Sequence, residues 1–310
     1  APELRWAVIG CGVIANQMAQ SLALAGRKLT GVANRTLTKA QTFADQYGVE
    51  KVYDTVEDLY ADPDIDAVYI TTPHNTHITY LRAALAAGKH VLCEKAITLN
   101  SAELDEARAI AAEHNVVLMD ATTVLHMPLY QELRRRMDAG EFGRMNLAQL
   151  NFGSYKEYGD LTNRFYNRNL AGGAMLDIGV YALSVMRLFM ASQPVEVVSL
   201  GNTCETGVDV AGGIVCRNAE QQLGVVSLTL HSKQPKRSVI SFDNCYVEVN
   251  EYPRADHATI VWTADGHREE VAAGTEAYAL CYEMADLEQA VAGDDSKREL
   301  LDYASDVMEL

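Results

Sequence analysis

The sequence predicts a fold in two parts: an N-terminal α/β part on a parallel sheet, and a C-terminal α+β part on an open, mainly antiparallel sheet. Two observations predict it. Up to about residue 122, short apolar runs alternate with amphipathic segments, which is typical of a parallel sheet with helices on both faces. After that point, short alternating runs separated by turn residues follow one another, which is typical of antiparallel strands. We therefore predict domains at residues 1–122 and 123–310.

In the first domain, strands and helices alternate. Apolar runs predict strands at residues 6–9, 29–33, 52–53, 67–70, 90–93 and 116–119. Segments with helical periodicity lie between them and predict helices at residues 14–25, 38–47, 56–60, 76–87 and 101–114. Two of these helices have a clear stop signal, since one ends at Gly88 and a shorter one ends at Asp62, before Pro63.

The second domain begins with helices and continues with strands. Helices are predicted at residues 128–139 and 174–190. Short alternating runs then predict strands at residues 195–200, 213–216, 224–230, 238–242, 246–249 and 259–262. Two further helices, at residues 277–291 and 297–310, complete the chain.

Charge limits the possible partners. The formal net charge of −16 would repel a nucleic acid backbone and an anionic membrane surface. We therefore expect neither partner. An anionic cofactor remains compatible with this charge, because one arginine and a helix N-terminus can hold a phosphate locally.

Cysteine usage and hydropathy indicate a cytoplasmic protein. The six cysteines include no C-x-x-C pair, and a chain of 310 residues does not need disulfides to be stable, so we expect free thiols in a reducing compartment. No apolar run approaches the roughly 18 residues of a membrane span, and no signal-peptide pattern precedes the first strand.

A glycine motif joins the first predicted strand to the first helix. Gly10, Gly12 and Ala15 have the G-x-G-x-x-A spacing of a dinucleotide-binding turn, in the strand–turn–helix setting that this motif requires. The first glycine permits the tight turn, the second lets a pyrophosphate approach the backbone, and the alanine permits close packing of the helix. The amide groups of Val13 and Ile14 at the helix start are expected to face the phosphates. The first domain is therefore predicted to be a Rossmann domain.

The second strand ends at Asn34, Arg35 and Thr36, where NAD enzymes usually carry an acid that holds the ribose 2′-hydroxyl. Here a guanidinium takes that place, and it is suited to clamping a 2′-phosphate with help from Thr36. We therefore predict a preference for NADP over NAD. The alternative is that Arg35 stacks on the adenine of either cofactor.

A polar loop follows the strand at residues 67–70. We expect Thr72, Pro73, His74, Asn75 and His77 to contact the cofactor, because strand C-termini in such sheets face the ligand. The two histidines also allow a metal site as an alternative. Without a nearby set of carboxylates or cysteines we predict no metal.

Two separated pairs of residues carry the predicted chemistry. Glu94 and Lys95 end the strand at residues 90–93, at the predicted cofactor edge. Asp177 and Tyr181 lie four residues apart on one helix. A lysine beside a phenol moves a proton to or from an alcohol oxygen while a nicotinamide takes or gives the hydride. The alternative is a surface Glu–Lys pair and a core tyrosine.

These motifs resemble, in order, those of the Gfo/Idh/MocA oxidoreductases. The matching residues are Gly10, Gly12 and Ala15; Gly88, Lys89, His90, Val91, Glu94 and Lys95; and Gly172, Gly173, Asp177, Gly179 and Tyr181. The resemblance implies a Rossmann domain and a second domain whose sheet commonly makes subunit contacts. It also implies that Lys95 is the lysine of the family's Glu-Lys-Pro motif. A tyrosine at position 181 is similar to the dihydrodiol dehydrogenase and glucose-fructose oxidoreductase branch. In that branch the tyrosine is the proposed acid or base and the residue at Asp177 helps to organise the site.

The chain departs from the family pattern at two places. Ala96 replaces the usual proline after Lys95, and we expect a trans bond there because a cis bond before a non-proline residue costs about 3–4 kcal/mol. Arg168 stands where the pattern often has proline. Arg164 matches an arginine often seen in the family, and we predict that it faces the substrate together with Asp177 and Tyr181.

The sequence thus predicts an NAD(P)-dependent oxidoreductase that interconverts a secondary alcohol and a carbonyl on a sugar, polyol or diol. Lys95, Tyr181 and Asp177 are its predicted catalytic residues. One alternative is an enzyme that retains its cofactor and eliminates a glycosidic substituent after transient oxidation. Another is a nucleotide-binding sensor without catalysis. We expect a homodimer or a higher homo-oligomer.

Overall fold

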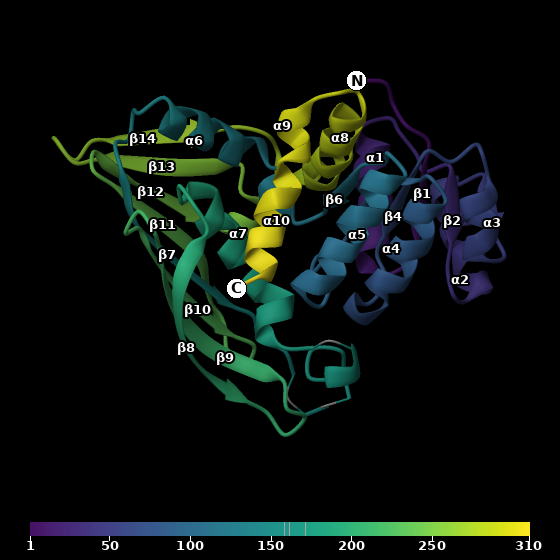
Figure 1. Ribbon diagram of the computed structural model, residues 1–310, viewed down its shortest axis with the longest axis horizontal. Coiled ribbons are helices and arrows are strands. Elements are labelled where there is room, and N and C mark those ends of the chain that lie inside the picture. The colour runs from purple at the N-terminus through teal and green to yellow at the C-terminus, as the bar shows by residue number, and fades with distance from the viewer. Residues whose placement is uncertain (158, 161, 171) are drawn as a thin grey trace. The chain divides into compact units, whose positions relative to one another are not determined.

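The structure is a computed structural model and describes residues 1–157, 159–160, 162–170 and 172–310. Two compact units make up the chain (Figure 1). The first contains Ala1–Ala121 and Ala277–Ser305, and the second contains Thr122–Glu276 and Asp306–Leu310. The sequence analysis assigned residues 277–305 to the second domain. They belong to the first unit, because this part of the chain buries apolar side chains in that unit's core.

A parallel sheet of six strands forms the centre of the first unit, in the order β3-β2-β1-β4-β5-β6. Its strands are β1 (Trp6–Ile9), β2 (Gly31–Ala33), β3 (Lys51–Tyr53), β4 (Ala67–Ile70), β5 (His90–Cys93) and β6 (Leu118–Asp120). The central strands β1, β4 and β5 lie at the predicted residues, and β1 and β4 are buried along their whole length. The predicted Rossmann-type sheet is therefore confirmed.

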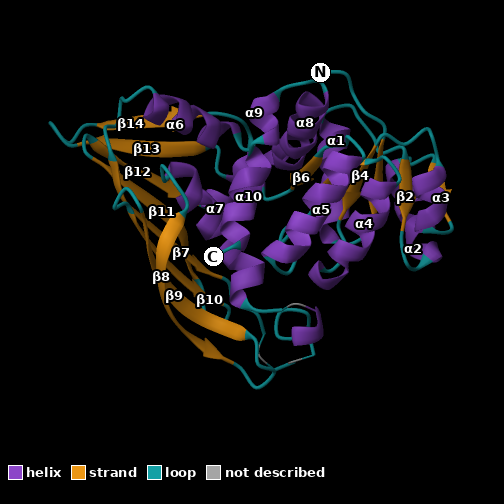
Figure 2. Ribbon diagram, viewed as in Figure 1, coloured by secondary structure: helices purple, strands orange, loops and turns teal. Residues whose placement is uncertain are grey.

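Helices alternate with these strands along the chain (Figure 2). They are α1 (Val13–Leu24), α2 (Leu37–Tyr47), α3 (Val56–Ala61), α4 (His77–Ala86) and α5 (Ser101–Glu113). Later in the chain, α8 (Ala279–Val291) and α9 (Asp295–Arg298) return to this unit. Leu280, Met284 and Leu287 of α8 are buried in the same core cluster as Met18 and Leu22 of α1. The burial of such side chains is the main force that holds the late helix in the first unit.

The second unit contains an eight-stranded sheet in the order β14-β13-β12-β11-β7-β10-β9-β8. Its strands are β7 (Met145–Gly153), β8 (Pro194–Thr203), β9 (Asp209–Asn218), β10 (Leu223–Thr229), β11 (Gln234–Phe242), β12 (Cys245–Asn250), β13 (His257–Trp262) and β14 (Arg268–Ala272). Only the pairing of β7 with β10 is parallel. The predicted, mainly antiparallel sheet is confirmed, but β7 and β14 were not predicted.

Two helices of the second unit accompany this sheet, α6 (Pro128–Asp138) and α7 (Val180–Phe189). The predicted helix at residues 174–190 begins as a π-helical turn, Met175–Gly179, and continues as α7. Cys216 of β9 lies against Met186 of α7, with 3.4 Å between their sulfurs, so α7 covers one face of the sheet. The helix α10 (Leu300–Met308) ends the chain and crosses the boundary between the units.

The sequence analysis predicted that the chain lacks a membrane-spanning helix and that its cysteines are free thiols. No helix in the described part of the chain combines the length and the apolar character needed to cross a bilayer. All six cysteines lie within the described residues, and all six are free thiols.

Candidate functional site

The turn between β1 and α1 has a backbone suited to close approach of a ligand. Gly10 has φ +102°, which favours glycine, and a Cβ there would lie 2.5 Å from Thr71 Oγ1. That hydroxyl is fixed, because it donates to Ile9 O at 2.9 Å. At Gly12, by contrast, a Cβ would meet nothing within 4 Å. The space beside the second glycine is therefore open to a pyrophosphate.

Val13 and Ile14 begin α1 directly after this turn, and no side chain caps the helix at its N-cap, Gly12. Asn16 Nδ2 donates to Gly12 O at 2.8 Å and to Cys11 O at 3.2 Å, which holds the turn on the helix. The start of α1 therefore presents backbone N–H groups and the positive end of its dipole, as a phosphate requires.

Asn34, Arg35 and Thr36 connect β2 to α2. Asn34 Nδ2 donates to Thr36 O at 3.1 Å and so closes the turn, and Thr36 occupies the N-cap position of α2. Arg35 is exposed and forms no ion pair with any described residue. Its guanidinium is thus available to an external anion.

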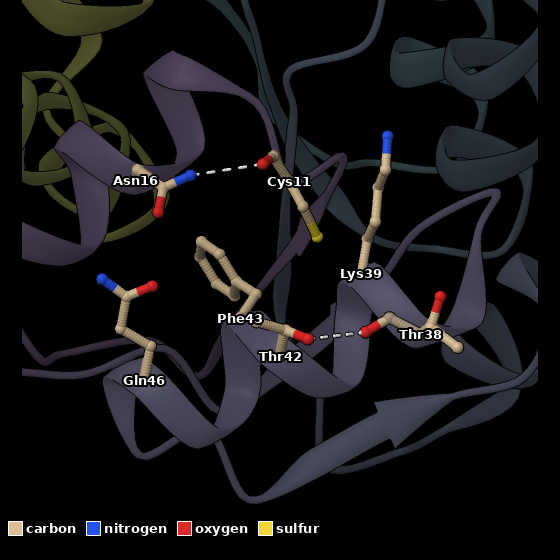
Figure 3. Close-up of a pocket in the computed structure, with 7 residues that line it drawn as sticks. All are labelled: Cys11, Asn16, Thr38, Lys39, Thr42, Phe43 and Gln46. Carbon is tan, nitrogen blue, oxygen red and sulfur yellow. Dashed lines mark hydrogen bonds between the residues drawn. The ribbon is translucent and has the colours of Figure 1, made fainter.

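A hollow of about 300 Å³ lies beside this turn (Figure 3). Its lining comes from the glycine turn, α1 and α2: Cys11, Asn16, Thr38, Lys39, Thr42, Phe43 and Gln46. Lys39 is the only charged residue among these, and it forms no ion pair with the described residues. Burial raises the pKa of Cys11 to about 11, so its thiol stays neutral. The sequence analysis missed Lys39. The available signal was a second cation four residues after Arg35, in the first turn of a predicted helix.

The polar loop after β4 contains residues of two kinds. Thr72, Asn75 and the exposed Pro73 lie at least partly at the surface. His74 and His77 are buried, and His77 is 0% exposed. The ring of His77 lies between backbone carbonyls, with Nε2 2.8 Å from Thr72 O and Nδ1 2.8 Å from Ala96 O. The prediction placed His77 in contact with the cofactor. The structure instead buries it beneath the loop, where it connects the segment after β4 to the segment after β5.

Glu94 and Lys95 follow β5 and are both largely buried. The Tyr69 hydroxyl donates to Glu94 Oε2 at 2.7 Å, which makes this glutamate part of the interior rather than of a surface ion pair. The Lys95–Ala96 peptide bond is cis, so the predicted trans bond is wrong. The prediction considered only the local cost of the bond, whereas Ala96 and Ile97 are fully buried and their carbonyls face His77. No cluster of three or more possible metal-ligating side chains occurs in the described part of the chain.

In the second unit, a pair of glycines fixes the start of the segment that carries Asp177 and Tyr181. A Cβ on Gly172 would lie 2.4 Å from Arg164 O, and a Cβ on Gly173, where φ is +122°, would lie 2.3 Å from Asp209 Oδ1. These two positions therefore require glycine. The carboxylate of Asp209 also accepts a hydrogen bond from Met175 N at 2.7 Å, which anchors the π-helical turn to the start of β9.

This packing brings together the residues predicted for the second half of the site. Arg164 Nη2 lies 3.6 Å from the buried Asp177 carboxylate, and the arginine is itself half exposed. Tyr181 stacks on Phe152 of β7, with 5.9 Å between ring centroids and 12° between ring planes. The sequence analysis missed Phe152 and Asp209. If residues 145–153 had been predicted as a strand, Phe152 would have been a candidate neighbour of the site.

The predicted residues thus form two sets. The first unit contains the glycine turn, the helix start, Lys95, and two cations, Arg35 and Lys39, that form no ion pair with the described residues. The turn, the helix start and these two cations fit a dinucleotide with phosphate groups. Arg164, Asp177 and Tyr181 lie in the second unit, where a phenol, a carboxylate and a guanidinium are suited to holding a hydroxyl or carbonyl compound and moving its proton. A Rossmann unit of this kind, followed by a sheet unit with such groups, defines the class of two-domain nicotinamide-dependent oxidoreductases.

Comparison with known families identifies the family. Residues 4–122 match the oxidoreductase family with an NAD-binding Rossmann fold, and residues 130–248 match the GFO/IDH/MocA C-terminal domain. The chain belongs to the Gfo/Idh/MocA family of oxidoreductases. The predicted resemblance and the predicted use of a nicotinamide dinucleotide are therefore confirmed.

The curated relatives include trans-1,2-dihydrobenzene-1,2-diol dehydrogenases from vertebrates. The Mus musculus protein is 32% identical over 244 residues, which is 77% of this chain and 72% of the relative. The Xenopus laevis protein is 30% identical over 263 residues, or 83% of this chain and 78% of the relative.

Solved structures show the same fold at lower sequence identity. A 3-ketoreductase from Actinomadura kijaniata, in complex with NADP and TDP-benzene, has a TM-score of 0.84 at 23% identity and covers 99% of this chain and 95% of its own. Levoglucosan dehydrogenase, in complex with NADH and levoglucosan, has a TM-score of 0.84 at 20% identity, with 99% and 96% covered.

Proposed function

We propose that this oxidoreductase is an NADP-preferring dehydrogenase or reductase that interconverts a secondary alcohol and a carbonyl on a sugar, polyol or diol. The observation that carries the proposal is the grouping of Tyr181, Asp177 and Arg164 in the second unit of a family member that retains Lys95. The names of the relatives support it, since the Mus musculus protein is a diol dehydrogenase and one structural neighbour acts on the sugar derivative levoglucosan.

Each residue has a defined task in this proposal. The Tyr181 phenolate takes the proton from the substrate hydroxyl during oxidation, and the resulting phenol returns it during reduction. The Lys95 ammonium polarises the same oxygen and favours the ionised phenol. Asp177, held by Arg164, orients the substrate. The bound nicotinamide accepts or gives the hydride.

The NADP preference is supported by Arg35 and Lys39. Two cations without ion-pair partners among the described residues border the turn and the hollow at the start of α2. A 2′-phosphate would compensate both charges, whereas a ribose hydroxyl would compensate neither.

Calorimetry and turnover measurements test this function in parallel. We expect NADP⁺ to bind more tightly than NAD⁺, and Arg35→Ala to remove the difference. A screen of sugars, polyols and diols, followed at the absorbance of NADPH, then identifies a substrate. Tyr181→Phe is expected to lower kcat by at least about 100-fold, because acid–base groups contribute 10²–10⁴-fold. Near wild-type turnover by both Tyr181→Phe and Lys95→Met would contradict the assigned roles.

The second unit is also proposed to form the contacts of a homo-oligomer. On the sheet face opposite α7, one row of register-paired residues contains Val198, Val215, Val225, Gln149 and Val239. Val198 is 73% exposed and nearby Leu200 is 85% exposed. An exposed, mainly apolar sheet face such as this is typical of a subunit contact. Light scattering should report at least two chains, and Val198→Arg should lower the mass toward that of one chain.

Six free cysteines support a reducing, cytoplasmic location for the proposed enzyme. Localisation of a tagged full-length protein in its own cells tests this part of the proposal.

A further inference from the structure

Two segments of the second unit carry a group of cations, two of which lie near Phe152 and Asp177. Their described residues are 154–157, 159–160, 162–168 and 229–236, and backbone hydrogen bonds hold the two segments together, such as Lys156 N to Leu230 O at 2.8 Å. The Tyr166 hydroxyl adds a contact to Leu230 O at 3.3 Å, and it also donates to Lys156 O of its own segment at 2.7 Å. These segments contain five lysines and arginines but only two acids, in a chain whose net charge is −16. We call Lys156, Arg164, Arg168, Lys233 and Lys236 the cationic rim.

Two members of the cationic rim, Lys236 and Arg164, lie near residues of the proposed substrate site. Lys236 Nζ lies 5.0 Å from the centroid of Phe152, the ring on which Tyr181 stacks. Arg164 reaches the Asp177 carboxylate at 3.6 Å. These two cations therefore belong to the surroundings of the phenol and the carboxylate.

Acidic side chains of the described residues leave part of this charge uncompensated. Arg168 and Lys233 are exposed and form no ion pair with the described residues. Lys236 has one acidic neighbour, Glu251, at 3.9 Å, and that glutamate is 77% exposed, so the attraction is weak.

Two rim cations also share one aromatic ring. Lys156 Nζ lies 4.2 Å and Arg164 Cζ lies 4.6 Å from the centroid of Phe165. Like charges held on one ring repel each other, and an anion between or beside them would reverse the sign of that interaction.

We propose that the cationic rim selects a substrate that carries an anionic group, a carboxylate or a phosphate, in addition to the reacting hydroxyl or carbonyl. This inference rests on the proposed function and narrows its substrate class from sugars, polyols and diols to their acidic or phosphorylated forms. Paired cations bind carboxylates and phosphates alike through charge-assisted hydrogen bonds. The rim therefore predicts an anionic group on the substrate but does not specify which of the two it is.

Ligand titrations test the inference without turnover. The protein is saturated with NADPH, which cannot accept a hydride from an alcohol, and titrated with D-glucose, D-glucuronate and D-glucose 6-phosphate. We expect at least one anionic ligand to bind with a Kd about tenfold or more below that of D-glucose. The reason is that a hydrogen bond between charged groups contributes more binding free energy than one between neutral groups, by an amount that corresponds to about tenfold in Kd. Raising the ionic strength should narrow the difference. A preference for D-glucuronate or for D-glucose 6-phosphate distinguishes the two anions.

Lys233→Gln is expected to narrow the difference between charged and neutral ligands by about threefold or more. Lys28→Gln is the matched control, because Lys28 is an exposed lysine of the first unit that pairs only with the exposed Glu50. It should leave the difference unchanged. Equal affinity for all three ligands, or no binding of either anion, would overturn the inference.

A second arm separates this inference from the proposed function. The rim cations would also favour the ionised form of a nearby phenol. If Lys233→Gln shifts the pH profile of kcat and leaves ligand preference intact, the rim serves Tyr181 and the inference is wrong. If anions bind through Lys233 while no ligand in a wide screen reduces NADP⁺, the anion site stands and the dehydrogenase assignment fails.

Discussion

His77 and Ala96 are joined across two loops of the first unit, with His77 Nδ1 2.8 Å from Ala96 O. The other ring nitrogen lies 2.8 Å from Thr72 O. One buried ring therefore holds the segment after β4 against the segment after β5, directly beside Lys95. Replacing His77 disturbs a loop that carries a proposed catalytic residue without touching that residue.

His77→Phe keeps a ring but removes both polar contacts. A neutral imidazole has one N–H, so the substitution leaves one buried carbonyl without its donor, at a cost of about 1–3 kcal/mol. We expect thermal unfolding to occur several degrees lower. His114→Phe is the control, since His114 is exposed at the end of α5 and should change the melting temperature little. An unchanged melting temperature for His77→Phe would show that no buried carbonyl depends on the N–H of this ring.

The same histidine predicts a pH dependence of stability. Burial lowers the pKa of His77 below its ordinary value of 6.5, and Lys95 adds to this effect, while the carbonyl contacts oppose it. The unfolded chain therefore binds a proton at a higher pH than the folded chain does. The contribution of His77 is fully present above about pH 6.5 and is lost as the pH falls below it. Denaturant titrations at about pH 7.5 and about pH 5.5 measure this effect. As the pH falls, the free energy of unfolding should decrease less for His77→Phe than for the wild type.

Much of the first unit could be predicted from the sequence, because strand, turn and helix signals there are local. β1, β4 and β5 are apolar runs between clear turns, and the glycine turn needs only the spacing of Gly10 and Gly12. β7 was missed because asparagine, glutamine, alanine and glycine, which occur throughout it, are uncommon in strands. Its pairing with β10 and β11 supplies what its own sequence lacks.

The candidate site, too, has features with a local sequence signal and features that depend on contacts between distant segments. Local motifs predict Arg35, Lys95 and Tyr181 as site residues, whereas the anchoring by Asp209 and the burial of His77 depend on contacts between distant segments. The place of α8 in the first unit depends on such contacts as well. The cis bond at Ala96 has no signal in a motif that lacks proline.

Cofactor preference should depend on Arg35 and Lys39 together. The two cations border one turn, and each has no ion-pair partner among the described residues. Lys39→Gln is expected to raise the Kd for NADP⁺ by about tenfold and to change the Kd for NAD⁺ little, because one charge-assisted contact to phosphate contributes about 1.5–3 kcal/mol. Gln46→Ala, in the same hollow, is the uncharged control. Equal losses for both cofactors would assign Lys39 to the fold of the hollow and not to the 2′-phosphate.

Asp209 is expected to position the proposed catalytic segment from a distance. Its carboxylate accepts from Met175 N at 2.7 Å and packs against Gly173, so it sets where the π-helical turn begins. Asp209→Ala removes this anchor, and loss of such a cap costs about 1 kcal/mol. We expect kcat to fall while the Kd for NADP⁺ stays constant, because the predicted cofactor residues lie in the first unit. Asp209→Asn retains an acceptor oxygen and should recover part of kcat.

Asp243→Ala provides the matched control for this prediction. Asp243 also accepts from a backbone N–H, that of Arg144 at 3.1 Å, but it does so at the turn between β11 and β12. Its loss should lower stability by a similar amount and leave kcat unchanged. If both variants lower kcat equally, the effect of Asp209 is a general loss of stability. If only Asp209→Ala lowers kcat, and Asp209→Asn restores it, β9 sets the position of the segment that carries Asp177 and Tyr181.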